Sequence, residues 1–380
     1  MIEYTEGDLL RLAKRRHNTR RTYLLVDPLQ GKHMPVSPAA ALRMMRALGE
    51  RLSAQTPGID LVIGFAETAT AVAAAAAMGM ERPCRYIHTT REGFPAGDAI
   101  DFLEEHSHAV EQRLCLERLR TWIDGASGIA LVDDELSTGK TMLNAIGQLR
   151  AACPSMASKR VTVASIISRL GDGRVRALAE MGDDCVSLLR LPEGDYSDAV
   201  RGYQIEGART PTGTGMAFEE LALSSAGDAR LGVLLPEWAD GLSAAFGGLA
   251  ERLRGRLAGK RVTVLGTEEY MLPGLLLGAL LEADGAPRSV RFHATTRSPI
   301  GICRDEGYPI RAGWRLRSFY DAQRPTFIYN LEPCDVALVV TDSPDGAAAR
   351  LAMGDLTAAL MEAGCGEALL IREERHVQHL

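Results

Sequence analysis

The chain has 380 residues, of which 46% are hydrophobic and 24% are charged, and its formal net charge is -6. This length exceeds what one hydrophobic core usually supports, so we expect two domains of a soluble globular protein. The acidic balance gives no electrostatic reason to expect nucleic acid or a membrane surface as a partner.

The cysteine pattern and the N-terminal residues predict a cytoplasmic protein. Seven cysteines are scattered without a CxxC pair, so their spacing predicts neither a zinc site nor a disulfide framework. Free thiols fit a reducing compartment. The first ten residues are acidic where a signal peptide would be basic and then apolar. The most apolar run, at residues 70–80, is too short to cross a bilayer.

In chain order, the first half alternates short β-rich runs with longer amphipathic runs. Strands are predicted at residues 21–29, 59–65, 84–90, 128–134 and 160–168, and helices at residues 37–55, 68–80 and 141–153. Strands that alternate with helices indicate an α/β fold with a mostly parallel sheet.

The second half repeats this order of elements. Three of its stretches match the first half: "ERLRGRLAGKRVTVLG" matches "ERLSAQTPGIDLVIG", "FHATTRSPIG" matches "YIHTTREG", and "VALVVTDSPDG" matches "IALVDDELSTG". Three matches in one order favour duplication of a domain, and two unrelated α/β domains remain the alternative. The stretch 207–215 is rich in Gly, Thr and Pro, which is typical of a boundary. We therefore predict domains at 1–210 and 228–380 with a linker at 211–227.

A binding site is predicted in the stretch "IALVDDELSTGKTMLNAIGQL", residues 129–149. Its Gly-Lys-Thr sequence resembles a P-loop, but Asp134 stands where a P-loop needs glycine, and a carboxylate there would repel phosphate. What remains is a strand, two acids, a short turn and a helix. Backbone amides converge at the helix N-terminus as a phosphate site, and Asp133 and Asp134 are natural acceptors for vicinal sugar hydroxyls. The sequence therefore predicts a loop that binds ribose 5-phosphate.

The stretch "LVDDELSTGKT" resembles the phosphoribosyl-pyrophosphate (PRPP) signature of type I phosphoribosyltransferases. The resemblance implies two Rossmann-like parallel-sheet domains of that kind, the second a degenerate repeat of the first. It also implies that Asp133 and Asp134 hold the ribose hydroxyls and, through them, organise Mg²⁺. The residues that match the 5′-phosphate loop are Ser137, Thr138, Gly139, Lys140 and Thr141, and those that match the pyrophosphate loop are Ala66, Glu67 and Thr68. An ordinary helix N-terminus is the alternative for this second set.

The same family covers the reacting carbon with a mobile loop, and residues 89–114 occupy that place. Arg91 in this segment is expected to neutralise the charge of the leaving group. His106 and His108 are either catalytic groups or solvated surface residues. Two departures from the sequences of known family members narrow the range of possible acceptors. Ser137 replaces the aspartate of hypoxanthine- and guanine-salvage enzymes, and the segment lacks the lysines found in orotate enzymes.

The layout also resembles the phosphoribosyltransferase-like proteins of bacterial tellurium-resistance and stress-response gene clusters. Their C-terminal domain is named for a Thr-Arg-Ser-Pro (TRSP) tetrapeptide, found here at residues 296–299. The acid pair becomes Thr341-Asp342 in this half and the phosphate turn becomes Ser-Pro-Asp-Gly, so PRPP binding is expected to be lost. The candidate residues that remain are His293, Arg297 and Ser298, with Glu268 and Glu269. They bind a different anionic substrate, contribute to the acceptor site or support the first domain. Lys32 and His33 face either site, or solvent.

These features predict a Mg²⁺-dependent enzyme of nucleotide metabolism. It would transfer phosphoribosyl from PRPP to an unidentified acceptor, such as a nitrogenous base, and release pyrophosphate in a stress-associated pathway. A PRPP-sensing regulator without catalysis is the alternative, and a PRPP-using activity without a base acceptor is a third. The family commonly pairs subunits, so we expect a homodimer, unless the internal duplication mimics that pairing within one chain.

Overall fold

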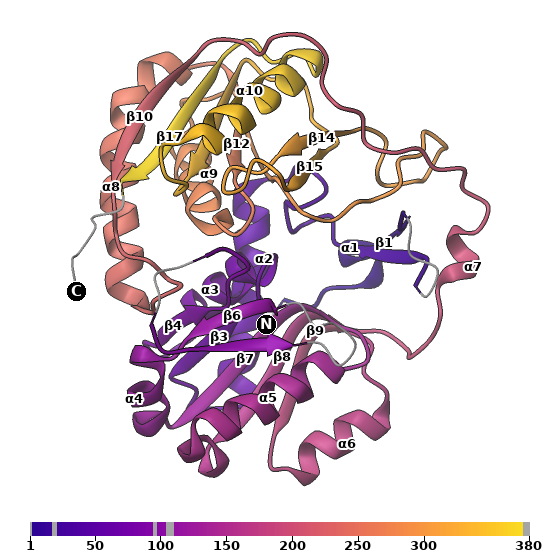
Figure 1. Cartoon of the computed structure of the whole chain (residues 1–380), viewed down its shortest axis with the longest axis vertical. Coiled ribbons are helices and arrows are strands. Elements are labelled where there is room, and N and C mark those ends of the chain that lie inside the picture. Colours follow the sequence, from indigo (N-terminus) through magenta and orange to yellow (C-terminus); the bar gives the residue numbers. More distant parts are fainter. Residues whose placement is uncertain (1, 17–20, 94–96, 104–109, 375–380) are drawn as a thin grey trace. The chain divides into compact units, whose positions relative to one another are not determined.

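The structure is a computed structural model, and it describes residues 2–16, 21–93, 97–103 and 110–374 (Figure 1). The chain divides into two compact units. The first unit comprises residues 1–5, 43–194 and 227–240, and the second comprises 6–42, 195–226 and 241–380. Neither unit is continuous in sequence, because α2 (Pro38–Gln55) and α8 (Leu235–Leu257) each contribute to both. The domains predicted at 1–210 and 228–380 are continuous segments, and these limits stay a prediction.

The first unit is built on a six-stranded sheet with the order β11-β4-β3-β7-β8-β9. All neighbours are parallel except β11, which pairs antiparallel with β4. The strands are β3 (Leu61–Gly64), β4 (Arg85–His88), β7 (Gly128–Leu136), β8 (Arg160–Ser168), β9 (Asp184–Arg190) and β11 (Val233–Leu234). The helices are α3 (Ala69–Met78), α4 (Glu117–Gly125), α5 (Lys140–Ala152) and α6 (Asp172–Glu180), with a 3-10 turn, η1 (Pro154–Ser158). The predicted α/β class with parallel strands is confirmed.

Small side chains let helices α2 and α3 approach each other closely in the first unit. Residues 69–77 of α3 are all buried, and most of them are alanine. A Cβ atom on Gly49 of α2 would stand only 1.8 Å from the carbonyl oxygen of Ala76. Glycine is therefore required at this crossing, because the backbones themselves are in contact.

The segment 89–114, predicted as a loop without regular structure, contains a two-stranded antiparallel arm. Its strands are β5 (Ala99–Leu103) and β6 (Val110–Cys115). Arg113 binds Asp101 across the arm through Nε at 2.6 Å and Nη2 at 3.1 Å. Backbone bonds between Thr90 and Arg113 attach the arm to the end of β4. His106 and His108 lie outside the described residues.

The second unit is built on a five-stranded, fully parallel sheet with the order β10-β17-β16-β12-β13. The strands are β10 (Phe218–Ser224), β12 (Arg261–Gly266), β13 (Ser289–Ala294), β16 (Val336–Thr341) and β17 (Ala368–Glu374). They are accompanied by α8, α9 (Met271–Asp284) and α10 (Ala347–Glu362). The remaining elements are α1 (Glu6–Leu9), α7 (Ser197–Val200) and two hairpins, β1 (Arg11–Lys14) with β2 (Tyr23–Val26) and β14 (Gly313–Arg317) with β15 (Pro325–Tyr329).

The two units share an order of elements and a set of hydrogen bonds. The strand order β4-β3-β7-β8 in the first unit has the counterpart β13-β12-β16-β17 in the second. The backbone N–H of Ala66 donates to Thr89 Oγ1 at 2.8 Å after β3, and the N–H of Glu268 donates to Thr295 Oγ1 at 3.0 Å after β12. In the first unit the arm β5–β6 follows β4, and in the second unit the hairpin β14–β15 follows β13. The arm is bonded through its backbone to Thr90, and the hairpin is bonded in the same way to Thr296.

Candidate functional site

Parallel strands bring three segments of the first unit to one edge of the sheet. In the registers of β3 with β4 and of β3 with β7, Gly64 lies opposite both His88 and Val132. Residues 65–68 and 89–91 follow the carboxyl ends of β3 and β4, and residues 133–141 comprise the last part of β7 and the turn after it, so all three segments lie at the carboxyl edge of the sheet. Ligands of open α/β sheets bind at this kind of edge. We call these three segments the first corner.

The acid pair lies in the last part of β7. Asp133 and Asp134 are half-buried, and no ion pair with either is found among the residues that the structure describes. The N–H of Asp134 donates to Asp133 Oδ1 at 2.9 Å. Burial, followed by the negative charge of Asp134, raises the pKa of Asp133 well above its ordinary value. A ligand that donates hydroxyl protons to this pair would relieve that electrostatic cost.

The predicted phosphate turn connects β7 to α5. Gly139 precedes the helix with a φ of 73°, and a Cβ atom there would meet Leu170 Cδ2 at 2.7 Å. No side chain caps the N-terminus of α5, and the side chains of Thr138, Lys140 and Thr141 are exposed. The N–H of Lys140, the first amide of the helix, donates to Thr138 Oγ1 only at 3.4 Å. The N-terminal amides are therefore weakly satisfied within the described residues, which favours anion binding at a helix N-terminus.

The three predicted pyrophosphate-loop residues lie between β3 and α3. The N–H of Ala66 donates to Thr89 Oγ1, and Thr89 donates in turn to Gln112 on β6. The peptide between Ala66 and Glu67 is cis. Thr70 Oγ1 donates to the carbonyl of Glu67 at 3.1 Å, and no side chain caps α3. The loop is thus bonded to both neighbouring segments, β4 and the arm.

A buried ion pair beside the acid pair was missed by sequence reasoning. Glu135 accepts hydrogen bonds from Arg169 through Nη2 at 3.1 Å and Nε at 3.4 Å, and both side chains are largely buried. Arg169 also donates to the carbonyl of Gly194 at 3.0 Å. This pair joins the carboxyl ends of β7 and β8 and so fixes the strand that carries the acids. A third acid directly after Asp133 and Asp134 was the available signal.

Arg91 lies just after β4, two residues beyond Thr89, and its side chain is exposed. The backbone N–H of Glu92 donates to Thr90 Oγ1 at 3.0 Å and forms the turn in which Arg91 stands. The position is at the first corner, and the predicted role in neutralising the leaving group stays a prediction.

In the second unit, the matching segments 267–270, 295–298 and 341–346 form what we call the second corner. Glu268 has a φ of 48° and a side chain that is 0% exposed. Its carboxylate accepts hydrogen bonds from Arg297 Nε at 3.1 Å, from Arg324 Nη2 at 2.8 Å and from Ser318 Oγ at 2.6 Å. The predicted candidate Arg297 is thus held in a buried ion cluster.

Two further acids, Asp342 in the second corner and Glu373 at the end of β17 beside it, also have partners within the protein. Tyr320 donates its hydroxyl to Asp342 Oδ1 at 2.6 Å, and Tyr270 donates to Glu373. Burial, followed by the charge of Glu373, raises the pKa of Tyr270 well above its ordinary value, so Tyr270 keeps its proton and remains a donor. The second corner is consequently a network of internally satisfied polar groups.

The two remaining candidates of the second half are His293 and Ser298, and each has its contacts with other groups than Arg297. The ring of His293 is fully buried, with Nδ1 2.8 Å from the carbonyl oxygen of Gly31 and Nε2 2.5 Å from that of Tyr329. Burial lowers the pKa of His293. The backbone N–H of Ser298 donates to Thr296 Oγ1 at 3.2 Å, as Glu92 does to Thr90 in the first unit. His293 therefore contacts backbone rather than Arg297.

Lys32 and His33 are both buried. Burial, followed by the charge of Lys32, lowers the pKa of His33 well below its ordinary value. A neutral imidazole at physiological pH follows from this environment.

Within the described ranges, no group of three or more His, Cys, Asp and Glu side chains is arranged to hold a metal ion. None of the described helices combines the length and the apolar character that a membrane span needs.

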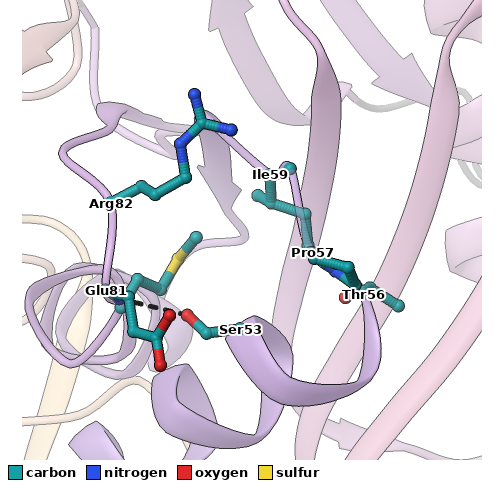
Figure 2. A pocket seen from close by; sticks show the side chains of 8 residues that line it. Ser53, Thr56, Pro57, Ile59, Glu81 and Arg82 are labelled. Atoms are coloured by element: carbon teal, nitrogen blue, oxygen red, sulfur yellow. Dashed lines mark hydrogen bonds between the residues drawn. The ribbon is translucent and has the colours of Figure 1, made fainter.

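A small cavity of about 40 Å³ lies in the first unit between the ends of α2 and α3 (Figure 2). It is lined by residues 53, 56–59 and 80–82, and the N–H of Glu81 donates to Ser53 Oγ at 3.1 Å. Residues 56–59 precede β3, so this cavity is at the amino end of the strand, whereas the acid pair is at the carboxyl edge. Its volume suits one or two water molecules rather than a sugar phosphate.

Comparison with known families and structures gives the following matches. Residues 9–193 match a family described as phosphoribosyl transferase, and residues 227–360 match the TRSP domain found C-terminal to it. The adenine phosphoribosyltransferase of Giardia lamblia is 16% identical, covering 49% of this chain and 95% of its own, with a TM-score of 0.36. The orotate phosphoribosyltransferase of Aeropyrum pernix is 21% identical, covering 49% of this chain and 89% of its own, with a TM-score of 0.31. Likeness at this level carries no inference about activity. A search of curated proteins gives no match.

Proposed function

Because this chain belongs to the phosphoribosyl transferase family that carries a C-terminal TRSP domain, we propose that it transfers the 5-phosphoribosyl group of PRPP to a small-molecule acceptor. The observation that carries the proposal is the first corner. Two half-buried acids, without a cationic partner among the residues that the structure describes, stand only a few residues before a helix N-terminus whose N-cap residue, Gly139, has no side chain. This is the spacing that a sugar bearing vicinal hydroxyls and a 5′-phosphate requires.

In the proposed complex, Asp133 and Asp134 accept protons from the two ribose hydroxyls in short, charge-assisted hydrogen bonds. The amides of residues 137–141 bind the 5′-phosphate at the N-terminus of α5. The exposed side chains of Thr138, Lys140 and Thr141 add donors and positive charge. The sugar is thereby held at both ends, which fixes C1 relative to the loop at residues 66–68.

The proposed reaction is displacement at C1. The acceptor's lone pair forms a bond to C1 while the bond from C1 to the pyrophosphate oxygen breaks, and the electron pair leaves with pyrophosphate. The transition state resembles an oxocarbenium ion, so no covalent enzyme nucleophile is needed. Catalysis then comes from alignment of the acceptor, exclusion of water by the arm, and stabilisation of the leaving group by Ala66–Thr68 and Arg91.

Mg²⁺ fits the residues of the first corner. It prefers oxygen ligands, keeps several waters and is usually bound through one or two carboxylates together with substrate phosphates. Asp133 and Asp134 would hold the ribose hydroxyls, and through these hydroxyls they would organise the ion. A site of this kind needs no cluster of three protein ligands. When bound with PRPP, the ion would neutralise charge on the departing pyrophosphate.

The finer parts of the proposal concern the acceptor, the pathway and the second unit. Ser137 and the lysine-free segment 89–114 disfavour hypoxanthine, guanine and orotate as acceptors. A place in nucleotide metabolism, a link to tellurium resistance or stress, a cytoplasmic location and a homodimer stay predictions. The shared strand order and the paired threonine bonds support an origin of the second unit as a degenerate repeat of the first.

The test is incubation of the full chain with PRPP, Mg²⁺ and a panel of bases and cell metabolites, followed by measurement of pyrophosphate release. Release that depends on one acceptor is the expected result. Release without any acceptor indicates hydrolysis, and calorimetric binding of PRPP without turnover under every acceptor favours the sensing alternative. Absence of any heat with PRPP and Mg²⁺ overturns the proposal.

A further inference from the structure

A cleft of about 270 Å³ lies on the β14–β15 hairpin of the second unit. It is lined by the end of β14, the turn at 322–324 and Asp355 of α10. Its volume is slightly below the roughly 300–1,000 Å³ typical of small-molecule sites. Three of the lining side chains are arginines, Arg315, Arg317 and Arg324, and Asp355 is the only acid among the residues that line it.

Two of these arginines are held in fixed orientations. Arg317 binds Asp355 in a fork, with Nε 2.8 Å from Oδ2 and Nη2 2.5 Å from Oδ1, and its backbone N–H donates to the same carboxylate at 2.9 Å. This fork uses one edge of the guanidinium, so the Nη1 donors of Arg317 are left for another acceptor. Arg324 donates to Glu268 at 2.8 Å and to Ser318 at 2.7 Å. Pre-orientation of this kind lowers the entropy lost on binding.

The third arginine, Arg315, differs from the other two. The side chain of Arg315 is exposed on β14, and no ion pair with it is found in the part of the chain that the structure describes. Its backbone N–H donates to the carbonyl of Arg209 at 2.7 Å, which fixes the strand that carries it. Asp321 is not among the residues that line the cleft, and its carboxylate accepts the N–H of Gln323 at 2.9 Å. With Arg317 paired to Asp355 and Arg324 to Glu268, the positive charge in excess at the cleft is that of Arg315.

We propose that this cleft binds the phosphate group of a small phosphorylated molecule. One carboxylate is satisfied by a single guanidinium fork, as Asp355 is by Arg317. A tetrahedral phosphate has three free oxygens and a charge near -2, so it matches donors that converge from several arginines. The inference is independent of PRPP binding at the first corner, because every residue that it uses belongs to the second unit.

The experiment is hydrogen–deuterium exchange of the full chain with ribose 5-phosphate or inorganic phosphate as the probe. Peptides that cover residues 313–329 are expected to gain protection, and the apparent affinity is read from its concentration dependence. Arg315→Glu should weaken this apparent affinity about tenfold, which is the change that loss of one charge-assisted contact implies. Arg315→Lys, which keeps the charge, should weaken it less. Peptides that cover residues 133–141 report separately on the first corner.

The controls test whether the protection depends on Arg315 and on phosphate. Arg288→Glu makes the same charge change at another exposed arginine of the second unit and should leave the protection unchanged. Sodium chloride at equal ionic strength should give none, and acetate should give much less than phosphate. Equal protection in Arg315→Glu and the unsubstituted protein, or equal protection by chloride, overturns the proposal. Equal protection by acetate overturns the choice of phosphate.

Discussion

In the first corner, two half-buried carboxylates lie in the last part of a strand with no cation beside them among the described residues, whereas in the second corner one buried carboxylate accepts hydrogen bonds from two arginines and a serine. Both corners follow the same three strands of their sheets, and both are organised by a threonine hydroxyl that accepts a backbone N–H, Thr89 or Thr295. The backbone arrangement is therefore the same while the electrostatics are opposite. An unneutralised corner keeps the capacity to bind a ligand, and a neutralised corner contributes to stability instead.

The largest expected effect concerns ligand binding at the first corner. Asp134→Asn removes a charged acceptor of the ribose hydroxyls, so PRPP-dependent turnover should fall about 100-fold or more, while unfolding by denaturant should change little. Asp342→Asn is the matched control, because Asp342 holds the corresponding place in the second corner and already accepts the Tyr320 hydroxyl. It should leave PRPP binding unchanged. Equal loss of activity and stability in Asp134→Asn would show that this acid is structural.

The next effect concerns stability at the second corner. Glu268→Ala leaves Arg297 and Arg324, whose side chains are only 17% and 22% exposed, without their shared carboxylate. Loss of one partner from a buried pair typically costs about 3 kcal/mol or more. Unfolding of the full chain by urea should therefore shift to lower denaturant concentration, and Glu268→Gln should cost less because an amide oxygen still accepts hydrogen bonds. Glu306→Ala, at an exposed glutamate, is the control. A change below about 1 kcal/mol would contradict a stabilising role for the cluster.

Much of the first corner could be predicted from the sequence because it is local. The acids, the turn and the helix start lie within nine residues, and buried parallel strands read as continuous apolar runs. The close approach of Leu170 to Gly139 could not be predicted, because Leu170 belongs to a separate segment of the chain. The ion pair of Glu135 with Arg169 was also missed, because its partners are 34 residues apart.

The second corner shows why the rest could not be predicted. Glu268, Arg297 and Arg324 come from three segments that only the folded sheet and hairpin bring together. Sequence comparison identified Arg297 and Glu268 as candidates without showing that they neutralise each other. The assignment of residues 6–42 to the second unit is likewise invisible in the order of the chain.

A third prediction compares two glycines that precede helices in the two corners. Gly139 has a φ of 73° and would place a Cβ atom 2.7 Å from Leu170, so Gly139→Ala should lower the free energy of unfolding by about 1–2 kcal/mol and weaken PRPP binding. Gly346 has a φ of -162°, and a Cβ atom there would meet only the carbonyl oxygen of Pro344 at 3.9 Å. Gly346→Ala should therefore be neutral or slightly stabilising. Denaturant titration of both variants measures the difference, and an equal cost would contradict it.

The smallest expected effect is a gain of stability at the first corner, and it tests whether the unneutralised acids are kept for function. Burial raises the pKa of Asp133 above its ordinary value of 3.8. As the pH rises past 3.8, the Asp133 carboxyl therefore loses its proton in the unfolded chain at a lower pH than in the folded chain. The stability of the unsubstituted protein therefore falls with rising pH until the raised pKa is passed. Asp133→Asn removes this loss and should be more stable at neutral pH by on the order of 1 kcal/mol, with no such gain below the ordinary pKa.

The same substitution should weaken binding of PRPP with Mg²⁺, since a neutral amide is a poorer acceptor for the ribose hydroxyls. Thermal unfolding across pH and calorimetry with PRPP measure the two effects, and Asp240→Asn, at an exposed aspartate of the same unit, is the control. Lower stability of Asp133→Asn at neutral pH would mean that the carboxylate makes stabilising contacts, and the contrast between the two corners would then fail at its central residue. Higher stability with weaker binding would mean that the first corner retains a destabilising charge because a ligand needs it.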